Sequence, residues 1–327
     1  MYNKSLESPN LVDRCNPSWY GTCFRVKNME ESVAFYVQNF HMRLIEQKTE
    51  NEDVYSVLIS PKQSDVSQIS SCMAVRSLLQ NTVSLNLRYS NNQDDAAYEE
   101  MNNGNVEPYR GFGHIAFNCN SVDETCEKLE SQGVRFHKRP NEGRMKGLAF
   151  ALDPSGYWIE IVGRGKTHFP EEFNFSQTMI RVKDPQKSLQ FYRDVLGMHL
   201  VREMHMSDFS NYFLAYLPES FVSKDDRSPE EQREFVHSLW NPCLELTHNH
   251  GTENNAEFHY HNGNTPPVGF SHLSFHLDNL GQFKEVTLQK CIHMGSPKKC
   301  QCKSSMMVWI QDPDGYYIKL VDRKSIT

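Results

Sequence analysis

The chain has 327 residues, of which 38% are hydrophobic and 23% are charged, and its formal net charge is −7. This length is long for one hydrophobic core and sufficient for two domains of ordinary size. The acidic balance and the lack of a long basic run exclude a nucleic-acid partner, and the absence of a long apolar run excludes a membrane span.

The first predicted element is the strand "CFRVK", followed by an amphipathic helix with Asn28 as its N-cap. Val33, Tyr36 and Val37 recur at helical spacing and are expected on the apolar face of this helix. Three strands follow, ending with "VSLNLRY". The strand "HIAFNC", the helix "VDETCEKLESQG" and a hairpin closed by the turn "DPSG" come next. This order is β-α-β-β-β, written twice.

The second half of the chain repeats the first half. "GTCFRVKNMEESVAFYVQNFHMRL" from Gly21 returns as "QTMIRVKDPQKSLQFYRDVLGMHL" from Gln177, an offset of 156 residues. "NNGN" returns as "HNGN", and "DPSGYWIEIV" returns as "DPDGYYIKLV", in the same order and with offsets of 159 residues. Self-similarity at a nearly constant spacing, here 156 to 159 residues, indicates a duplicated module.

The repeat therefore predicts an α+β fold with two modules, residues 18–165 and 172–325, made of four βαβββ units. The Gly-rich and charged stretch 163–175 is the expected junction. In the second module Asp184 is the expected N-cap, and the expected apolar face consists of Leu189, Tyr192 and Val195. The sequence makes no prediction about order in the segment 218–240.

The nine cysteines are odd in number and scattered, which suits a reducing compartment better than a disulfide framework. The pair in "CQC" at 300–302 lacks a second pair, so we interpret these as free surface thiols rather than a metal site. The N-terminal residues lack the apolar stretch of a signal peptide. A cytoplasmic location is the expectation.

Four side chains are candidates for chemistry, although each also has an ordinary structural explanation. Glu245 alternates with leucines in "LELTHN", and such a residue commonly faces solvent. Glu160 shares a strand face with Trp158, and a buried carboxylate needs a partner or a metal ion. His114 fits equally well as a core histidine, and Gln177 as an ordinary polar residue at the start of a strand.

Comparing the two copies strengthens these four candidates. The four matched pairs of positions are Gly21 and Gln177, Asn86 and Glu245, His114 and His272, and Glu160 and Lys319. The good metal ligands are split between the copies, so a site built within one copy would lack half of its ligands. A site shared across the copies would be complete, and its twin would lack ligands.

Together these motifs resemble glyoxalase I (lactoylglutathione lyase), of the vicinal-oxygen-chelate superfamily. The resemblance covers nearly the whole chain after residue 18 and rests on "RGFGHIAF", "GRMKGLAF", "DPSGYWIEIV", "QTMIRVKDPQKSLQFYRDVLGM", "LELTHNHGTEN" and "HNGN". It implies tandem glyoxalase-type modules paired into curved sheets, with metal sites in shared clefts. It also implies a monomer that contains an internal pseudo-dimer.

The resemblance assigns roles to particular residues. It implies one divalent metal ion per chain, with zinc expected ahead of nickel or cobalt, bound by His114, Glu160, Gln177 and Glu245. Glutathione would be the co-substrate, and its implied contacts are Arg110, Lys138, Arg144, Met145, Arg181 and Asn249. The implied reaction converts the hemithioacetal of methylglyoxal and glutathione to S-D-lactoylglutathione.

In this reaction the ion is expected to act as a Lewis acid that stabilises an enediolate. Glu160 would be the principal catalytic base, and Glu245 would serve the opposite face of the substrate. The degenerate second site would contain Gly21, Asn86, His272 and Lys319. An ammonium about 4 Å from a divalent ion would repel it by roughly 8 kcal/mol at an effective dielectric constant near 20.

Two other functions remain open from the sequence. A former lyase could still bind glutathione conjugates without catalysis, although a complete ligand set argues against this alternative. A ring-cleaving dioxygenase would need two histidines and one carboxylate around Fe(II), whereas the complete set has one histidine. The extra histidines in "THNHG" and "FHYHNG" lie in polar, loop-like stretches and are expected on the surface.

Overall fold

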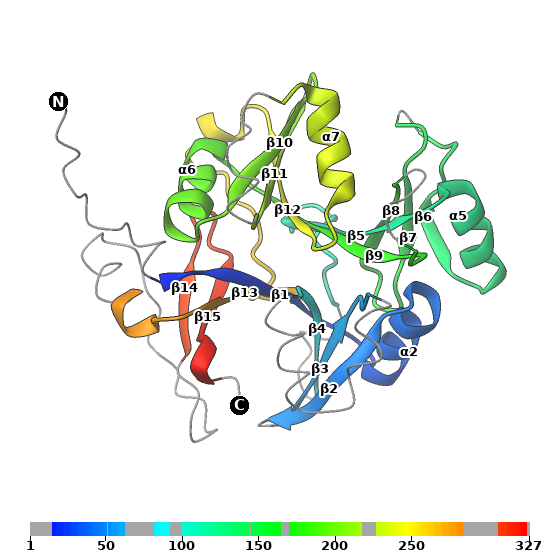
Figure 1. The fold of residues 1–327 in the computed structure, drawn as a ribbon, viewed down its shortest axis with the longest axis horizontal. Helices are drawn as coiled ribbons and strands as arrows, with labels where there is room; N and C mark the ends of the chain where they lie inside the picture. The colour runs from blue at the N-terminus through cyan, green and yellow to red at the C-terminus, as the bar shows by residue number, and fades with distance from the viewer. Residues whose placement is uncertain are drawn as a thin grey trace.

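The computed structural model describes residues 15–50, 52–62, 82–91, 100–143, 145–164, 170–217, 227–283 and 307–325. Its strands form two mixed sheets, and helices flank both of them (Figure 1). The seven-stranded sheet has the order β14-β15-β13-β1-β4-β3-β2, and the eight-stranded sheet has the order β10-β11-β12-β9-β5-β8-β7-β6. The predicted α+β class is confirmed, and neither sheet closes into a barrel.

The elements follow the predicted order in the first copy, whereas in the second copy the helix α7 stands between β11 and β12, and residues 284–306 between β13 and β14 lie outside the described part. The first copy contains β1 (Ser18–Arg25), α2 (Met29–Phe40), β2 (Arg43–Glu50), β3 (Asp53–Ile59), β4 (Ser84–Ser90), β5 (Phe112–Cys119), α5 (Val122–Ser131), β6 (Arg135–Lys138), β7 (Ala149–Leu152) and β8 (Trp158–Gly163). The second copy contains β9 (Asn174–Arg181), α6 (Pro185–Gln190), β10 (His199–His205), β11 (Phe209–Ala215), α7 (Pro229–Ser238), β12 (Cys243–Asn249), β13 (Phe270–Leu277), β14 (Met307–Gln311) and β15 (Tyr317–Asp322).

Each sheet takes strands from both copies. The eight-stranded sheet joins β5 to β8 of the first copy with β9 to β12 of the second. The seven-stranded sheet joins β1 to β4 with β13 to β15. The halves of the two copies are therefore exchanged between the sheets, which is the crossed arrangement that the split of candidate ligands requires.

Polar side chains cap the N-terminus of the first helix of each copy as predicted. The Asn28 side chain accepts a hydrogen bond from the backbone N–H of Glu31, and the Asp184 side chain accepts from Gln186 and Lys187. These bonds satisfy N–H groups that have no partner within the helix. One face prediction is wrong: Val37 is 38% exposed, while Phe40 one turn later packs in the core.

The helix α7 lies in the segment for which the sequence made no prediction, of which residues 218–226 are outside the described part. Ser228 and Glu231 form a reciprocal capping box at its start, and Pro229 occupies its first turn. Val236 on this helix packs with Val201 and Phe213 in a small separate cluster. The helix therefore packs against the end of the eight-stranded sheet that contains β10 and β11 (Figure 1).

Equivalent residues of the two copies meet at the centre of the molecule. The hydroxyl oxygens of Thr22 and Thr178, which are 156 positions apart, lie 2.7 Å from each other. The rings of Phe112 and Phe270 stack with centroids 5.1 Å apart. A pseudo-twofold axis thus passes between the copies, and a single large hydrophobic core surrounds it.

Buried tyrosine–aspartate hydrogen bonds connect the two units within each copy. The Tyr36 hydroxyl donates to Asp153 at 3.0 Å, and the Tyr192 hydroxyl donates to Asp312 at 2.8 Å. Each aspartate belongs to a "DP-G" turn, and each tyrosine lies in or directly after the first helix of the same copy. Because the units lie in different sheets, each bond links one sheet to the other.

We expect Tyr192→Phe to lower the free energy of unfolding by about 1–3 kcal/mol, because it leaves a buried carboxyl oxygen without its donor. Urea denaturation monitored by tyrosine and tryptophan fluorescence measures the change. Tyr109→Phe is the matched control, since Tyr109 is 40% exposed, and its effect should be below about 0.5 kcal/mol. Equal effects of both substitutions would contradict a specific role for the bond to Asp312.

Two further expectations concern membranes and cysteines. Within the described residues, no helix has both the length and the apolar character that a membrane crossing requires. The described cysteines have free thiols, namely Cys15, Cys23, Cys119, Cys126 and Cys243. The "CQC" motif at 300–302 lies outside the described residues.

Candidate metal centre

The four predicted ligands come from four adjacent strands of the eight-stranded sheet. Glu245 lies on β12, Gln177 on β9, His114 on β5 and Glu160 on β8, and these strands are neighbours in that order. All four side chains are buried, with at most 8% of their surface exposed. Since side chains on one face of a sheet meet across strands, the register directs these four to one point.

The polar atoms of this group lie within bonding distance of one another. Nε2 of His114 is 3.2 Å from Oε2 of Glu160 and 3.5 Å from Oε2 of Glu245. The Gln177 amide donates to the same two oxygens, at 3.1 Å and 2.9 Å. The structure thus brings together the ligand set that the sequence predicted.

Burial and the two carboxylates together determine the protonation of this group. Burial lowers the pKa of His114, but the adjacent Glu160 and Glu245 raise it more, to about 9. Burial raises the pKa of Glu245, and the nearby charge of Glu160 acts in the same direction, while His114 opposes both. Two carboxylates in one buried place repel each other, so the centre favours a cation.

The donor set fits a divalent metal ion. One atom each from His114, Glu160 and Glu245 lie within 4.8 Å of one another, and no other His, Cys, Asp or Glu group in the described ranges is arranged this way. Nε2 of His114 is buried and makes no well-aligned hydrogen bond within these ranges, although it faces two carboxylate oxygens. One imidazole nitrogen, two carboxylates and an amide oxygen suit a catalytic first-row ion.

A residue that the sequence reading missed also contacts this centre. The Asn211 amide on β11 donates to Oε1 of Glu245 at 2.5 Å, and its own oxygen accepts from the Thr247 hydroxyl at 3.0 Å. Asn211 is buried in the otherwise largely apolar strand "FSNYFLA". The signal available in the sequence was this polar amide in a strand whose other residues are mostly apolar.

The four equivalent positions on the seven-stranded sheet have different surroundings. They occupy the neighbouring strands β4, β1, β13 and β15 and are Asn86, Gly21, His272 and Lys319. Asn86 pairs with Cys23, and Glu245 pairs with Met179, so the two residues have the same register relative to β1 and β9.

The surroundings of these four positions, the second crevice, are positively charged and partly filled. The first crevice is the corresponding place around His114, Glu160, Gln177 and Glu245. A Cβ atom on Gly21 would lie 2.4 Å from the Asn86 amide nitrogen, so the Asn86 side chain takes space that a larger residue at position 21 would need. Burial lowers the pKa of His272 well below its usual value, and the charges of Lys319, Arg25 and Arg88 lower it further. The pKa shifts of His114 and His272 therefore have opposite signs.

Three predicted glutathione contacts gather near the ends of β9 and β12, which Arg181 and Asn249 occupy. Arg110 is 39% exposed and pairs with Glu107 at 3.2 Å, and the Asn249 amide donates to the Tyr260 hydroxyl at 2.8 Å. Burial raises the pKa of Tyr260, while Asn249, Arg181 and Arg110 act to lower it, so all three lie close to this hydroxyl. Tyr260 is a further residue that sequence reasoning did not identify.

Arg181 is buried and binds a loop of the protein. It donates to the carbonyl oxygens of Gly104, Gly111 and Phe112, at 3.0 to 3.3 Å, and to Oδ1 of Asn105 at 2.8 Å. Burial, together with Arg110, lowers its pKa to about 10.

The equivalent Arg25 makes the matching contacts in the second crevice, with Gly263, Gly269, Phe270 and Asn264. This shared set of bonds holds the "NGN" loop in both copies, whether or not the crevice contains the candidate ligands.

The remaining predicted contacts lie near the hairpin that precedes β7. The Lys138 ammonium donates to the Met145 carbonyl oxygen at 2.8 Å, and burial followed by the charge of Lys146 lowers its pKa. Met145 is 40% exposed. Arg144 lies outside the described residues.

Comparisons with known proteins identify the family of this chain. The sequence profile of the Glyoxalase/Bleomycin resistance protein/Dioxygenase superfamily matches residues 20–161 and 174–320. The chain belongs to this superfamily. The glyoxalase I of Saccharomyces cerevisiae is 39% identical over 92% of this chain and 90% of its own length. The lactoylglutathione lyase of Schizosaccharomyces pombe is 35% identical, over 93% of this chain and 95% of its own length.

A solved structure has the same overall fold. Glyoxalase I from Zea mays superposes with a TM-score of 0.66 at 20% identity, covering 94% of this chain and 93% of the other. The predicted resemblance to glyoxalase I and the predicted organisation of two glyoxalase-type modules are confirmed.

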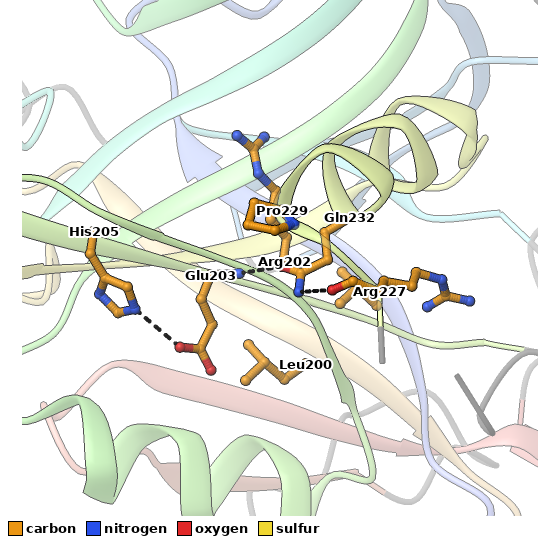
Figure 2. Close-up of a pocket in the computed structure, with 8 residues that line it drawn as sticks. Leu200, Arg202, Glu203, His205, Arg227, Pro229 and Gln232 are labelled. Carbon is orange, nitrogen blue, oxygen red and sulfur yellow. Dashed lines mark hydrogen bonds and ion pairs between the residues drawn. The ribbon is translucent and has the colours of Figure 1, made fainter. Parts of the chain in front are cut away.

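A separate pocket of about 340 Å³ lies at the edge strand β10, beside α7 (Figure 2). It is lined by Leu200, Val201, Arg202, Glu203, His205, Arg227, Pro229 and Gln232. Gln232 accepts a hydrogen bond from the backbone N–H of Glu203 at 3.3 Å, which covers part of this sheet edge. None of the predicted metal ligands lines this pocket, so the pocket is separate from the candidate metal centre.

Proposed function

We propose that this protein is a metal-dependent lactoylglutathione lyase with one active site per chain. It would isomerise the hemithioacetal of methylglyoxal and glutathione to S-D-lactoylglutathione. The observation that carries the proposal is the convergence of Gln177, Glu245, His114 and Glu160 at one buried point between the two copies. Relatives named glyoxalase I and lactoylglutathione lyase, 39% and 35% identical over more than 90% of this chain, support it.

The four side chains would hold a divalent ion, with zinc expected first and nickel or cobalt as alternatives. When bound, the ion supplies Lewis-acid stabilisation of negative charge on the substrate oxygens. Gln177 would present its amide oxygen to the ion, which requires its amide group to turn over from the present hydrogen bonds to the carboxylates.

The two carboxylates would move the proton. Glu160 would take the proton from C1 of the hemithioacetal and return it to C2, so that the thiohemiacetal carbon becomes the thioester carbonyl. Glu245 would serve the opposite face of the substrate. Both groups lie within one crevice and share Gln177 and His114 as neighbours, so either can reach a substrate bound there.

The charged groups around the crevice would hold glutathione. Arg110, Asn249 and Arg181 lie near the Tyr260 hydroxyl, while Lys138 and Met145 lie near the β6–β7 hairpin. Guanidinium groups bind carboxylates with two parallel hydrogen bonds, which suits the two carboxylates of glutathione. Arg181 would contribute mainly by holding the loop that contains Arg110.

The second crevice would bind no metal ion. Lys319, Arg25 and Arg88 surround His272 with positive charge, and Asn86 fills the space beside Gly21. Because the two copies already form an internal pseudo-dimer through their shared sheets, the protein would be a monomer with one active site.

The test is a spectrophotometric assay of thioester formation from methylglyoxal and glutathione by the zinc-loaded protein. We expect turnover, and we expect kcat/KM to be at least about 100-fold lower with 2-mercaptoethanol, which lacks the carboxylates that charged hydrogen bonds would hold. Binding of S-substituted glutathione without turnover would instead favour a non-catalytic binding protein. Consumption of dioxygen with a catechol would favour the dioxygenase alternative.

A further inference from the structure

The two carboxylates of the candidate metal centre are held differently. Glu245 is bonded through both oxygens, since Oε1 accepts from Asn211 at 2.5 Å and Oε2 accepts from Gln177 at 2.9 Å. Glu160 accepts from Gln177 through Oε2, and among the described residues no donor bonds its Oε1. The two groups are therefore not interchangeable in this chain.

Asn211 is itself fixed in orientation. The Thr247 hydroxyl donates to Oδ1 of Asn211 at 3.0 Å, so the amide NH₂ group is directed toward the Glu245 carboxylate. Asn211, Thr247 and Glu245 are each at most 7% exposed, so water does not compete for these bonds. Asn211 and Thr247 are direct partners in the pairing of β11 with β12, which places both on the same face as Glu245.

The second crevice lacks this arrangement. By strand register, Tyr55 on β3 stands where Asn211 stands on β11, and Arg88 stands where Thr247 stands. The Tyr55 hydroxyl and the Arg88 guanidinium both donate to Asp53 instead. The pair of Asn211 and Thr247 is therefore present only beside the crevice that contains the two carboxylates, and not at the equivalent positions of the second crevice.

We propose that Asn211 is a positioning residue that anchors Glu245 through Oε1 and thereby fixes the direction of its second oxygen. This inference rests on the proposed metal-dependent lyase function. With Oε1 held by Asn211, Oε2 of Glu245 is directed toward Nε2 of His114, 3.5 Å away, where it would serve as a metal ligand. Hydrogen-bond partners of metal ligands commonly contribute about 10- to 100-fold to metal affinity or activity.

The test substitutes Asn211→Leu, which keeps a similar volume and removes the donor. We expect the zinc dissociation constant, measured by competition with a chromophoric chelator, to rise about 10- to 100-fold. At saturating zinc we expect kcat to fall while KM for the hemithioacetal stays within about twofold, because Asn211 acts on a ligand and not on glutathione. Thr247→Val should weaken zinc binding less and in the same direction, since it removes only the group that orients the amide.

Ser210→Ala is the matched control, because Ser210 is the neighbouring buried residue on β11 and contacts His205 and His250. It should leave zinc affinity and kcat unchanged, and thermal unfolding of each apoprotein shows that the variants are folded. If Asn211→Leu does not fold, Thr247→Val carries the test alone.

Zinc affinity within twofold of the wild type in both Asn211→Leu and Thr247→Val would overturn the proposal. Wild-type protein that binds zinc but does not isomerise the hemithioacetal would refute the proposed function, while the affinity comparison would still decide the role of Asn211. Wild-type protein that binds no divalent ion would overturn both.

Discussion

Glu160→Gln is expected to lower kcat/KM for the hemithioacetal by at least about 100-fold, since general base catalysis contributes about 10²- to 10⁴-fold. The substitution keeps the shape of the side chain and an oxygen that can face the ion, but it removes the proton acceptor. The loss should appear in kcat, measured at saturating zinc, with little change in KM.

Lys319→Gln is the matched control, because Lys319 occupies the equivalent strand position in the other crevice. Its activity should stay within about twofold of the wild type. Full activity in Glu160→Gln would remove Glu160 from the role of base. A larger loss in Glu245→Gln than in Glu160→Gln would reverse the proposed roles of the two carboxylates.

Metal analysis by mass spectrometry should find close to one divalent ion per chain in wild-type protein. His114→Ala should reduce this to near zero, because it removes the only nitrogen ligand of the proposed set. His272→Ala should leave one ion bound, since the charges of Lys319, Arg25 and Arg88 already oppose a cation beside His272.

Removal of the ion with a chelator should abolish isomerisation, and added zinc should restore it. Two ions per chain would show that the second crevice also binds metal, contrary to the proposal. No ion after loading with zinc and removal of the excess would favour the non-catalytic binding protein.

The sequence predicted the ligands because the two copies could be compared position by position. Glu160 is equivalent to Lys319 in the repeat, and Gln177 is equivalent to Gly21. These differences indicated that only a crevice shared by the two copies would have a complete ligand set. The same comparison favoured an exchange of strands between the sheets. The four candidate ligands can meet only if β12, β9, β5 and β8 are neighbours in one sheet, as they are.

Other features could not be predicted because they depend on contacts between distant segments. Asn211 bonds Glu245 only when β11 pairs with β12 in one particular register. Arg181 was predicted to contact glutathione, but its donors are directed to the loop from Gly104 to Phe112, which periodicity cannot reveal. Val37 has helical spacing, yet the rotation of α2 on the sheet buries Phe40 and exposes Val37.

The exchange of strands between the copies also affects how such a protein can change over time. Each copy supplies two residues to each crevice. The second copy gives Gln177 and Glu245 to the crevice with the carboxylates, and His272 and Lys319 to the other. The first copy gives His114 and Glu160 to the crevice with the carboxylates, and Gly21 and Asn86 to the other. If one crevice is released from selection, its substitutions therefore fall equally on both halves of the gene. Neither half becomes the inactive one, and neither can be deleted without removing part of the remaining site.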